Sequence, residues 1–153
     1  MARTRVGLIS DTHGLLRPQA LAFLQGCDFI IHGGDIGDPA ILAALSAIAP
    51  LTVVRGNNDT QPWTRDIPVS ATLQIGALRI FAIHDIKEMG AAPAGVRAVV
   101  SGHSHKPSLR EDAGVFYINP GSAGRRRFSL PIAVGELMVD GELITPRIVE
   151  LLV

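Results

Sequence analysis

Short apolar runs alternate with helix-like segments through the first hundred residues, and this alternation constrains the fold most strongly. Segments 18–25 and 39–49 begin at prolines and repeat leucine and isoleucine at helical spacing, which predicts two short helices. The runs around them predict buried strands at 6–9, 29–31 and 51–55. Strands that alternate with helices in this way are typical of a mostly parallel sheet with crossover helices on both faces.

After residue 63 the pattern changes from alternating strands and helices to strands joined by tight turns. Segment 87–95 is expected to be a short helix or a loop, because Pro93 interrupts it. The remaining apolar runs predict strands at 69–75, 78–83, 98–100, 109–110, 115–118, 131–139 and 143–152. With no repeat and no linker in the sequence, we expect one domain over residues 1–153 in which two sheets pack together.

Composition bounds the classes of protein that remain. The chain has 153 residues and is 47% hydrophobic, which is enough to bury a core without disulfides. Cys27 is the only cysteine, so an internal disulfide and a zinc site built from thiolates are both excluded. The 14 basic residues balance the 14 acidic ones, which disfavours a role in coating nucleic acid or binding an anionic membrane. Apolar runs too short for a signal peptide or a membrane span predict a cytoplasmic protein.

Metal-ligand side chains follow the predicted strands, at the point where each strand ends. Ligands gather at the carboxyl ends of strands in open α/β sheets, so side chains from separate loops can converge there. Asp-x-His and His-x-His spacings suit a metal ion, because alternate residues of an extended segment project to the same side. Five runs end in such blocks: Asp11-Thr12-His13, Gly33-Gly34-Asp35, Gly56-Asn57-Asn58-Asp59, His84 and Gly102-His103-Ser104-His105.

The candidate ligands are more numerous than one tetrahedral zinc ion needs, and they suit two adjacent ions that share a carboxylate. They are Asp11, His13, Asp35, Asn57, His84, His103 and His105. The glycines at 33, 34, 56 and 102 predict tight turns and a close approach of the backbone. Each block alone has an ordinary structural explanation, and His32 and Asp38 are interpreted as a core histidine and a helix cap. Their recurrence at successive strand ends is what indicates a metal site.

In order and spacing these blocks resemble the signature of the calcineurin-like metallophosphoesterases, above all the small phosphodiesterases of the YfcE type. The resemblance runs from the first strand to Asn119-Pro120-Gly121-Ser122. It implies an α/β protein, a four-layer α/β/β/α sandwich of two mixed sheets with two divalent ions at one end. It also implies that one ion is held by Asp11, His13 and His105, the other by Asn57, His84 and His103, and that Asp35 bridges them.

The sequence departs from the family pattern at two places. Many members carry a histidine that acts on the leaving group or the transition state where this chain has Asn58, which disfavours the cleavage of poor leaving groups. Many also continue the His84 block as His-Gly-His, whereas Asp85 and Ile86 follow here. The segment up to Gly102 is short, so few residues are left for a loop over the substrate.

The resemblance implies a metal-dependent phosphodiesterase that hydrolyses a small or activated phosphodiester, with a hydroxide shared by two ions as nucleophile. We expect Asn58 to donate a hydrogen bond to a phosphoryl oxygen, and Asp59 to orient a ligand from behind, as Asn119 or Ser122 could also do. The loop after them carries Arg125, Arg126 and Arg127. These arginines are interpreted either as a clamp for the substrate phosphate or as a solvated basic loop.

Oxygen and imidazole ligands together favour Mn²⁺, with Fe²⁺, Zn²⁺ or Ni²⁺ as alternatives, over Mg²⁺ or Ca²⁺. The competing functions are a phosphomonoesterase, a nuclease, and a metal-binding scaffold for protein interactions, the role of the retromer subunit that shares this fold. An intact ligand set favours catalysis over a scaffold. Balanced charge and 5% aromatic residues argue against a nuclease, so a small phosphodiester is the expected partner, with neither a membrane nor an obligate nucleic acid. A homo-oligomer is compatible with the sequence.

Overall fold

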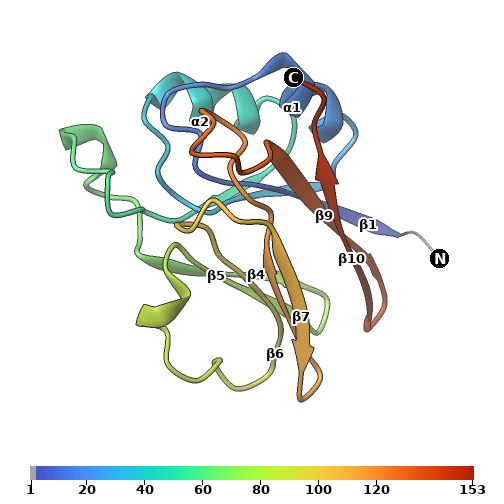
Figure 1. The fold of residues 1–153 in the computed structure, drawn as a ribbon. Helices are drawn as coiled ribbons and strands as arrows, with labels where there is room; N and C mark the ends of the chain where they lie inside the picture. Colours follow the sequence, from blue (N-terminus) through green and yellow to red (C-terminus); the bar gives the residue numbers. More distant parts are fainter. Residues whose placement is uncertain (1–2) are drawn as a thin grey trace.

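Two five-stranded sheets lie face to face in the computed structural model, which describes residues 3–153 (Figure 1). The first sheet has the order β10-β9-β1-β2-β3, formed by β1 (Thr4–Ile9), β2 (Phe29–His32), β3 (Leu51–Val53), β9 (Ala133–Asp140) and β10 (Leu143–Glu150). The second has the order β4-β5-β6-β8-β7, formed by β4 (Ser70–Ile75), β5 (Leu78–Ile83), β6 (Val96–Val100), β7 (Ser108–Asp112) and β8 (Val115–Asn119).

Both α-helices, α1 (Pro18–Leu24) and α2 (Pro39–Ser46), pack on the outer face of the first sheet. Their buried residues, among them Leu24 and Leu45, form one apolar cluster with Ile30 of β2. The crossovers β1-α1-β2 and β2-α2-β3 run in the same direction, and crossovers of one hand place their helices on the same face. The expectation of helices on both faces is therefore wrong, because the other face is buried against the second sheet.

The core between the sheets is built from residues that alternate along the strands. Leu8 and Ile31 of the first sheet and Ile80, Ala98 and Ile118 of the second are at most 1% exposed and belong to one cluster. Because side chains of a strand alternate between its faces, a shift of one residue in register would turn this whole set away from the core between the sheets. The pairing of the strands is thus fixed by the burial of one face of each sheet.

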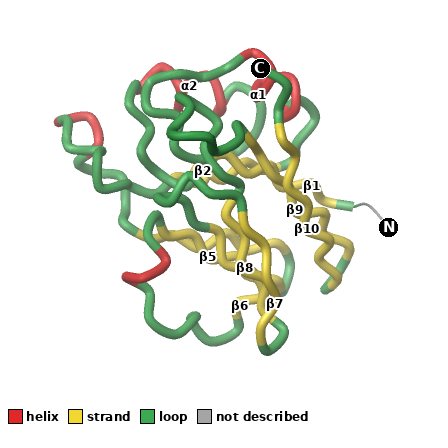
Figure 2. The backbone as a smooth tube through the Cα atoms, in the orientation of Figure 1, coloured by secondary structure: helices red, strands yellow, loops and turns green. Residues whose placement is uncertain are grey.

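Beside the second sheet the helical layer is thin. The described residues place there only a single-turn 3-10 helix, η2 (Ile86–Glu88), followed by a loop, as expected for segment 87–95. A similar turn, η1 (Pro62–Thr64), lies in the connection from β3 to β4. Figure 2 shows the long helices gathered on one side of the molecule, with loops filling much of the rest. The α/β class and the two mixed sheets are confirmed.

The first and last strands of the chain share a sheet. β9 runs antiparallel to β1, with Thr4 opposite Val139, and β10 pairs with β9 at the edge. Within the sheets β1, β2 and β3 run parallel, as do β5, β6 and β8. Parallel strands bring their carboxyl ends to one edge, which is where the candidate ligands follow.

Within residues 3–153, no helix combines the length and the apolar character that crossing a membrane requires.

Candidate metal centre

The structure brings all seven predicted ligands together at the carboxyl ends of the strands. Asp11 and His13 follow β1, Asp35 follows β2, Asn57 follows β3, His84 follows β5, and His103 and His105 follow β6. A hydrogen bond joins the two sheets at this point, since the His103 N–H donates to Asp11 Oδ2 at 3.1 Å. Within the second sheet, the Gly102 N–H donates to the His84 carbonyl oxygen at 2.9 Å.

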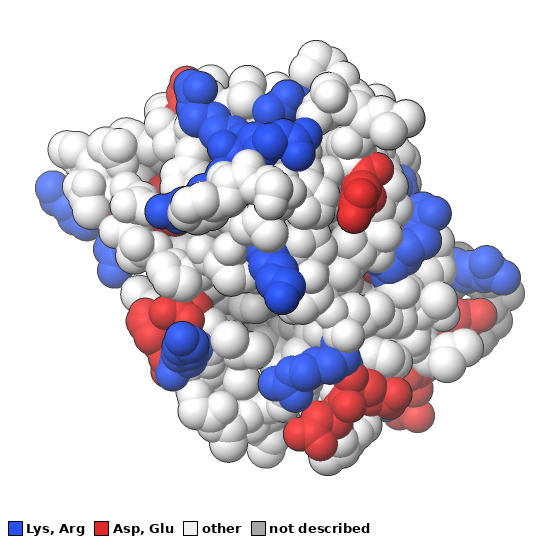
Figure 3. Space-filling model, in the orientation of Figure 1, with Lys and Arg blue, Asp and Glu red and all other residues white. Residues whose placement is uncertain are grey.

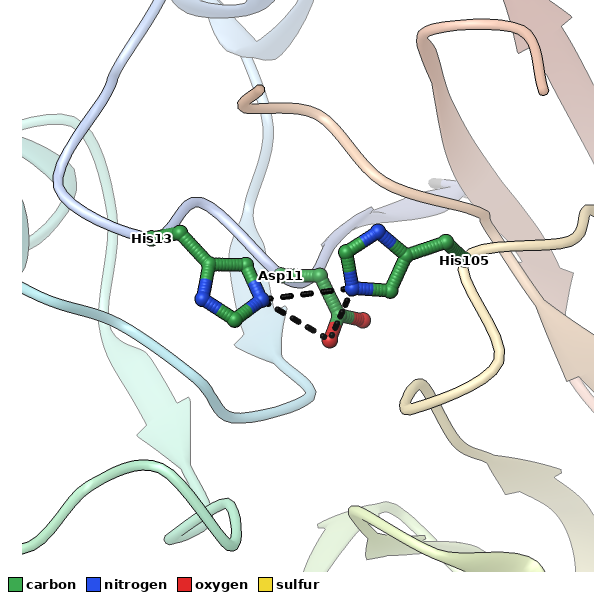
Figure 4. Close-up of side chains that lie close together, drawn as sticks. All are labelled: Asp11, His13 and His105. Carbon is green, nitrogen blue, oxygen red and sulfur yellow. Dashed lines mark hydrogen bonds and ion pairs between the residues drawn. The ribbon is translucent and has the colours of Figure 1, made fainter. Parts of the chain in front are cut away.

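Asp11, His13 and His105 form a first group of converging ligand atoms (Figure 4). The Nε2 atoms of the two histidines lie 3.2 Å apart, and Asp11 Oδ1 lies 3.8 Å and 3.4 Å from them. Within residues 3–153, Asp11 Oδ1 is buried without a hydrogen-bond partner, because Ser10 Oγ and the His103 N–H both donate to Oδ2. A buried oxygen without a partner costs free energy, and a cation bound between these atoms would supply one.

Asp35, Asn57, His84 and His103 form a second group next to the first. His84 Nε2 lies 3.3 Å from Asp35 Oδ2 and 3.0 Å from Asn57 Oδ1, and His103 Nδ1 lies 3.2 Å from the same amide oxygen. His84 Nδ1 donates to the Gly33 carbonyl oxygen at 2.6 Å, which leaves Nε2 free to face the group. Asp35 Oδ2 is also 3.5 Å from Nε2 of His13, so Asp35 lies between the two groups.

The donor set of the two groups fits divalent metal ions. Imidazole nitrogens, carboxylate oxygens and an amide oxygen are ligands that Mn²⁺, Fe²⁺ and Zn²⁺ accept. Ligand atoms within 4.8 Å of one another occur as two overlapping sets, one of Asp11, His13 and His105 and one of Asp11, Asp35 and His84. Asp11 thus belongs to both sets, whereas the residue expected to be shared by two ions is Asp35.

Electrostatics at the cluster keep the carboxylates ionised. Burial alone would raise the pKa of Asp11, but the nearby imidazoles of His105 and His13 outweigh it and hold that pKa far below its usual value. The pKa of Asp35 is lowered in the same way, against its burial, by His84 and Asn58. Burial disfavours a charged His84, yet the two carboxylates raise its pKa to about 9. In the metal-free protein a proton on His84 therefore balances part of the negative charge.

Five of the seven predicted ligands have a left-handed backbone, a conformation that costs L-residues about 1 to 2 kcal/mol each. The φ angles are 54° at Asp11, 45° at His13, 58° at Asp35, 73° at His103 and 64° at His105. Neighbouring loops hold this geometry, since the N–H groups of Asp11 and His13 donate to the carbonyl oxygens of Gly34 and Asp35 at 3.0 and 2.9 Å. Sharp turns immediately after each strand direct these side chains into the cluster.

The glycines beside the ligands are required by close packing, as expected from the sequence. A Cβ at Gly56 would overlap the carboxylate and the backbone nitrogen of Asp35. A Cβ at Gly102 would overlap Ser10 Oγ and lie 2.6 Å from Asp11 Oδ2. Any larger residue at either position would displace a predicted ligand.

Asp59 connects the loops that follow β2 and β3. Its buried carboxylate accepts from the backbone N–H groups of Asp35 (2.9 Å), Ile36 (2.8 Å) and Gly56 (2.8 Å). This geometry suits a residue that positions candidate metal ligands without binding a metal itself, because it fixes the backbone of Asp35 and of the segment that carries Asn57.

His32 plays a similar part that sequence reasoning missed. The His32 side chain is fully buried, and burial lowers its pKa to about 4, so the ring is neutral. The Gly34 N–H donates to Nδ1 at 3.0 Å, which leaves the proton on Nε2 to donate to Thr12 Oγ1, also at 3.0 Å. Both nitrogens are therefore used within the protein, and His32 is not available as a ligand. A lone histidine in an apolar run gives no sequence signal for this role.

Asn119 and Ser122 support the cluster from the loop after β8. Asn119 Nδ2 donates to the Gly102 carbonyl oxygen at 2.9 Å and to Ser104 Oγ at 3.1 Å, which fixes the loop that carries His103 and His105. Ser122 Oγ donates to the Asp11 carbonyl oxygen at 3.0 Å. Both residues therefore hold ligand-bearing loops in place.

Asn58 lies at the cluster, whereas the three arginines lie on an exposed loop. The Asn58 backbone N–H and Nδ2 donate to Asp35 Oδ1 and Oδ2 at 2.9 and 3.0 Å. Arg125 to Arg127 are exposed on a loop whose base is tied to Asp11 through Ser122. Arg126 Nη1 donates to the Leu130 carbonyl oxygen at 3.1 Å, and the Arg127 guanidinium lies over the Phe128 ring. In the described chain no guanidinium of this loop forms a hydrogen bond or ion pair with a predicted ligand.

A cleft of about 680 Å³ opens beside the second group of ligand atoms. Its lining includes the candidate ligands Asn57, His84 and His103, together with Arg55 and Arg65. We call this hollow the Arg55 cleft.

Comparison with known proteins shows matches along almost the whole chain. Residues 4–142 match the calcineurin-like phosphoesterase superfamily domain. A probable metallophosphoesterase of Methanothermobacter thermautotrophicus is 32% identical, in an alignment that covers 94% of this chain and 91% of that protein.

Solved structures share the fold at lower identity. Vacuolar protein sorting 29 of Cryptosporidium parvum superposes with a TM-score of 0.82 at 20% identity, covering 97% of this chain and 92% of the other. The phosphoesterase Yfce of E. coli superposes with a TM-score of 0.71, also at 20% identity, covering 96% and 99%. At this identity the superpositions show a common fold.

Proposed function

The chain belongs to the calcineurin-like phosphoesterase superfamily, and from this premise we propose that it is a metal-dependent phosphodiesterase acting on small or activated phosphodiesters. The observation that carries the proposal is the intact and converging set of metal-ligand side chains at the strand ends. A chain that had lost catalysis would not need to retain five left-handed residues, each of which costs stability, to hold such a set.

Two divalent ions, with Mn²⁺ the first choice, are the proposed cofactors. Asp11, His13 and His105 would hold one, Asn57, His84 and His103 the other, and Asp35 would bridge them. Such ions act as Lewis acids on phosphoryl oxygens and make water a stronger nucleophile. The overlapping sets of ligand atoms around Asp11 and Asp35 support this division.

The remaining residues position the substrate. Asn58 Nδ2, which now donates to Asp35, is proposed to turn toward a phosphoryl oxygen, the role expected of a side chain at this place. Asp59 keeps the backbone of Asp35 and Gly56 in place and so acts on the reaction through them. Arg125, Arg126 and Arg127 are proposed to attract the substrate phosphate to the rim, because phosphoryl transfer depends mainly on positioning and charge stabilisation.

The shape of the site favours a diester over a monoester. A phosphodiester bound at the ligands has two substituents to place, and the Arg55 cleft offers about 680 Å³ directly beside His84 and His103. A nuclease would require a continuous basic groove. On the face seen in Figure 3, Lys and Arg gather at the top, and elsewhere basic and acidic groups are interspersed. A small substrate fits this distribution better than a polynucleotide.

A protein-interaction scaffold is the second candidate, because the fold superposes on vacuolar protein sorting 29. The converging ligand set supports catalysis over a scaffold. A scaffold does not need to catalyse a metal-dependent reaction. Failure to hydrolyse any ester despite bound ions would therefore favour the scaffold.

The test is hydrolysis of bis(4-nitrophenyl) phosphate and 4-nitrophenyl phosphate by metal-stripped protein resupplied with Mn²⁺. We expect the diester to have the higher kcat/KM, and Asp35→Ala to lower it by more than about 100-fold, beyond the usual effect of losing an outer-sphere partner. Asp112→Ala, an exposed aspartate at the far end of β7, is the matched control and should leave the rate unchanged. Full activity of Asp35→Ala would contradict the assignment, and a higher rate with the monoester would make the protein a phosphomonoesterase.

A further inference from the structure

The Arg55 cleft has a charged wall that metal binding does not explain. Arg55 is half-buried and Arg65 is exposed, and both lie on the segment that leads from β3 through η1 to β4. Arg55 Nη1 lies 3.5 Å from the Arg65 carbonyl oxygen, and the Arg55 N–H donates to the Pro68 carbonyl oxygen at 2.8 Å. The guanidinium of Arg55 is thus held along the wall of the cleft.

Neither guanidinium forms an ion pair within residues 3–153. Asp59 also lines the cleft, but its carboxylate is occupied by three backbone N–H groups. Asp85 also lines the cleft, where its carboxylate accepts from the Lys87 N–H at 3.1 Å and lies 3.8 Å from His103 Nε2. Glu88 is the third carboxylate in the lining. The two guanidinium groups therefore line the cleft with no carboxylate of the described chain within ion-pair distance, while the lining itself carries both signs of charge.

The position of this charge relative to the ligands limits what can bind it. Arg55 precedes Asn57 by two residues, so their Cα atoms are at most about 7 Å apart. Arg55 also lines the cleft that Asn57 and His84 line, so a substrate bound at the candidate ligands can extend to it. Guanidinium groups recognise phosphate with paired, charge-assisted hydrogen bonds, and binding energy from such a remote group can be used to accelerate the reaction.

We infer that the Arg55 cleft binds a second phosphate of the substrate, one carried by an alcohol of the phosphodiester that is cleaved at the metal centre. The inference rests on the proposed phosphodiesterase function and specifies its substrate class. Arg55 and Arg65 bind the second phosphate, and the apolar side chains of Pro62 and Ile83, which line the same cleft, contact the linker. The reaction itself is unchanged, since only the phosphodiester bond is hydrolysed.

The first test compares two substrates with the same reacting bond. Thymidine 5′-(4-nitrophenyl phosphate) lacks a second phosphate, and its 3′-phosphorylated analogue carries one. With Mn²⁺ and low salt we expect the 3′-phosphate to raise kcat/KM about tenfold, and added salt to reduce this ratio because exposed charges are screened. Arg55→Gln and Arg65→Gln should each lower the ratio toward one, and Arg55→Lys should lower it less.

Arg79→Gln is the matched control. Arg79 is exposed near the start of β5, about five residues of strand away from His84, or roughly 15 Å. This variant should keep the wild-type ratio. Arg65→Gln tests the inference independently of folding, because Arg65 is exposed whereas Arg55 is half-buried. A wild-type ratio of one or less, or equal losses with both substrates in the cleft variants, would overturn the inference.

A second measurement separates this inference from the proposed function. Trp63, the only tryptophan, lies between Pro62 and Thr64, which line the cleft, and its fluorescence can report on binding. We expect thymidine 3′,5′-bisphosphate to bind about tenfold more tightly than thymidine 5′-phosphate, and Arg55→Gln to remove the difference. Such binding without turnover of either diester would support the cleft and contradict the phosphodiesterase. Turnover of both diesters without any preference would support the phosphodiesterase and contradict the second phosphate site.

Discussion

The two ends of the sandwich use the left-handed backbone region in opposite ways. At the turn end, hairpins reverse at Gly76, Gly114 and Gly141, with φ of 59°, 80° and 61°, and a Cβ there would meet nothing within 4 Å. Ala113, beside Gly114, is the one non-glycine with positive φ in these turns. At the ligand end the left-handed residues include Asp11, His13, Asp35, His103 and His105.

This difference follows from what each end has to do. A hairpin only has to reverse the chain, and glycine does so without steric cost. A ligand loop must reverse the chain and also present a carboxylate or an imidazole, which glycine lacks. The ligand end therefore accepts strain that the turn end avoids, and neighbouring hydrogen bonds hold it there.

The largest expected effect comes from the loss of a strained candidate ligand. It tests whether the strain at the ligand end serves metal binding. Asp11→Asn removes the charge of a fully buried carboxylate while keeping its size. We expect Mn²⁺ affinity to fall by more than about 100-fold, about 2.7 kcal/mol, because the cluster then holds one negative charge fewer. Calorimetric titration of metal-stripped protein measures this, with Asp112→Asn as control. Affinity within threefold of wild type would show that the strained backbone at Asp11 serves no metal.

The second prediction concerns pH at the ligand end. The raised pKa of His84, about 9, means that this ring carries a proton below pH 9 in the metal-free protein. A metal must displace that proton, so affinity should rise about tenfold for each pH unit between 7 and 9 and level off above. Competition with a chelator at several pH values gives the slope. An affinity independent of pH over this range would show that His84 is neutral or not a ligand.

A third prediction tests close packing at the ligand end. In Gly56→Ala the added Cβ overlaps Asp35, so the loop after β2 or after β3 must move. We expect a loss of about 2 kcal/mol in the free energy of unfolding, together with weaker Mn²⁺ binding. Urea denaturation and metal titration measure the two effects. Unchanged metal binding in a destabilised variant would show that the added Cβ disturbs the packing without displacing a candidate ligand, contrary to the prediction.

The smallest effect is expected at the turn end. Gly76→Ala places a Cβ in open space but on a residue with φ of 59°, so only the backbone preference opposes it. The expected cost is about 1 kcal/mol, with Mn²⁺ affinity unchanged. Run beside Gly56→Ala, this variant shows whether the two ends are energetically distinct. Equal effects on metal binding would mean that they are not.

Much of the fold and of the candidate site was predictable from residue pattern. Apolar runs located the strands, because burial of one sheet face requires apolar residues at alternate positions and burial of both faces requires a continuous apolar run. The seven candidate ligands were predictable because Asp11, Asp35 and His84 each stand directly after, or within a few residues of, such a run. Proline at the first helical position and Asp38 at the N-cap located α2, where Asp38 Oδ1 accepts from the Ala40 N–H at 2.8 Å.

Features that depend on distant segments were not predictable in this way. Asp59 looks like a turn residue in sequence, and only the meeting of two loops gives it three N–H donors. His32 looks like a core residue until Thr12 and Gly34 are placed beside it. The Arg55 cleft has the same origin, because only the fold brings Arg55 and Arg65 into one hollow with His84 and His103.

The sequence by itself determined which segments become strands and which side chains stand at their ends, since both follow from local spacing and burial. Only the tertiary structure decided that β9 joins β1, that both helices lie on one face, and that five candidate ligands adopt a left-handed backbone. The physical reason is that these choices are set by contacts between residues far apart in the chain. Such contacts offset the free-energy cost of local conformations that an isolated segment would not adopt.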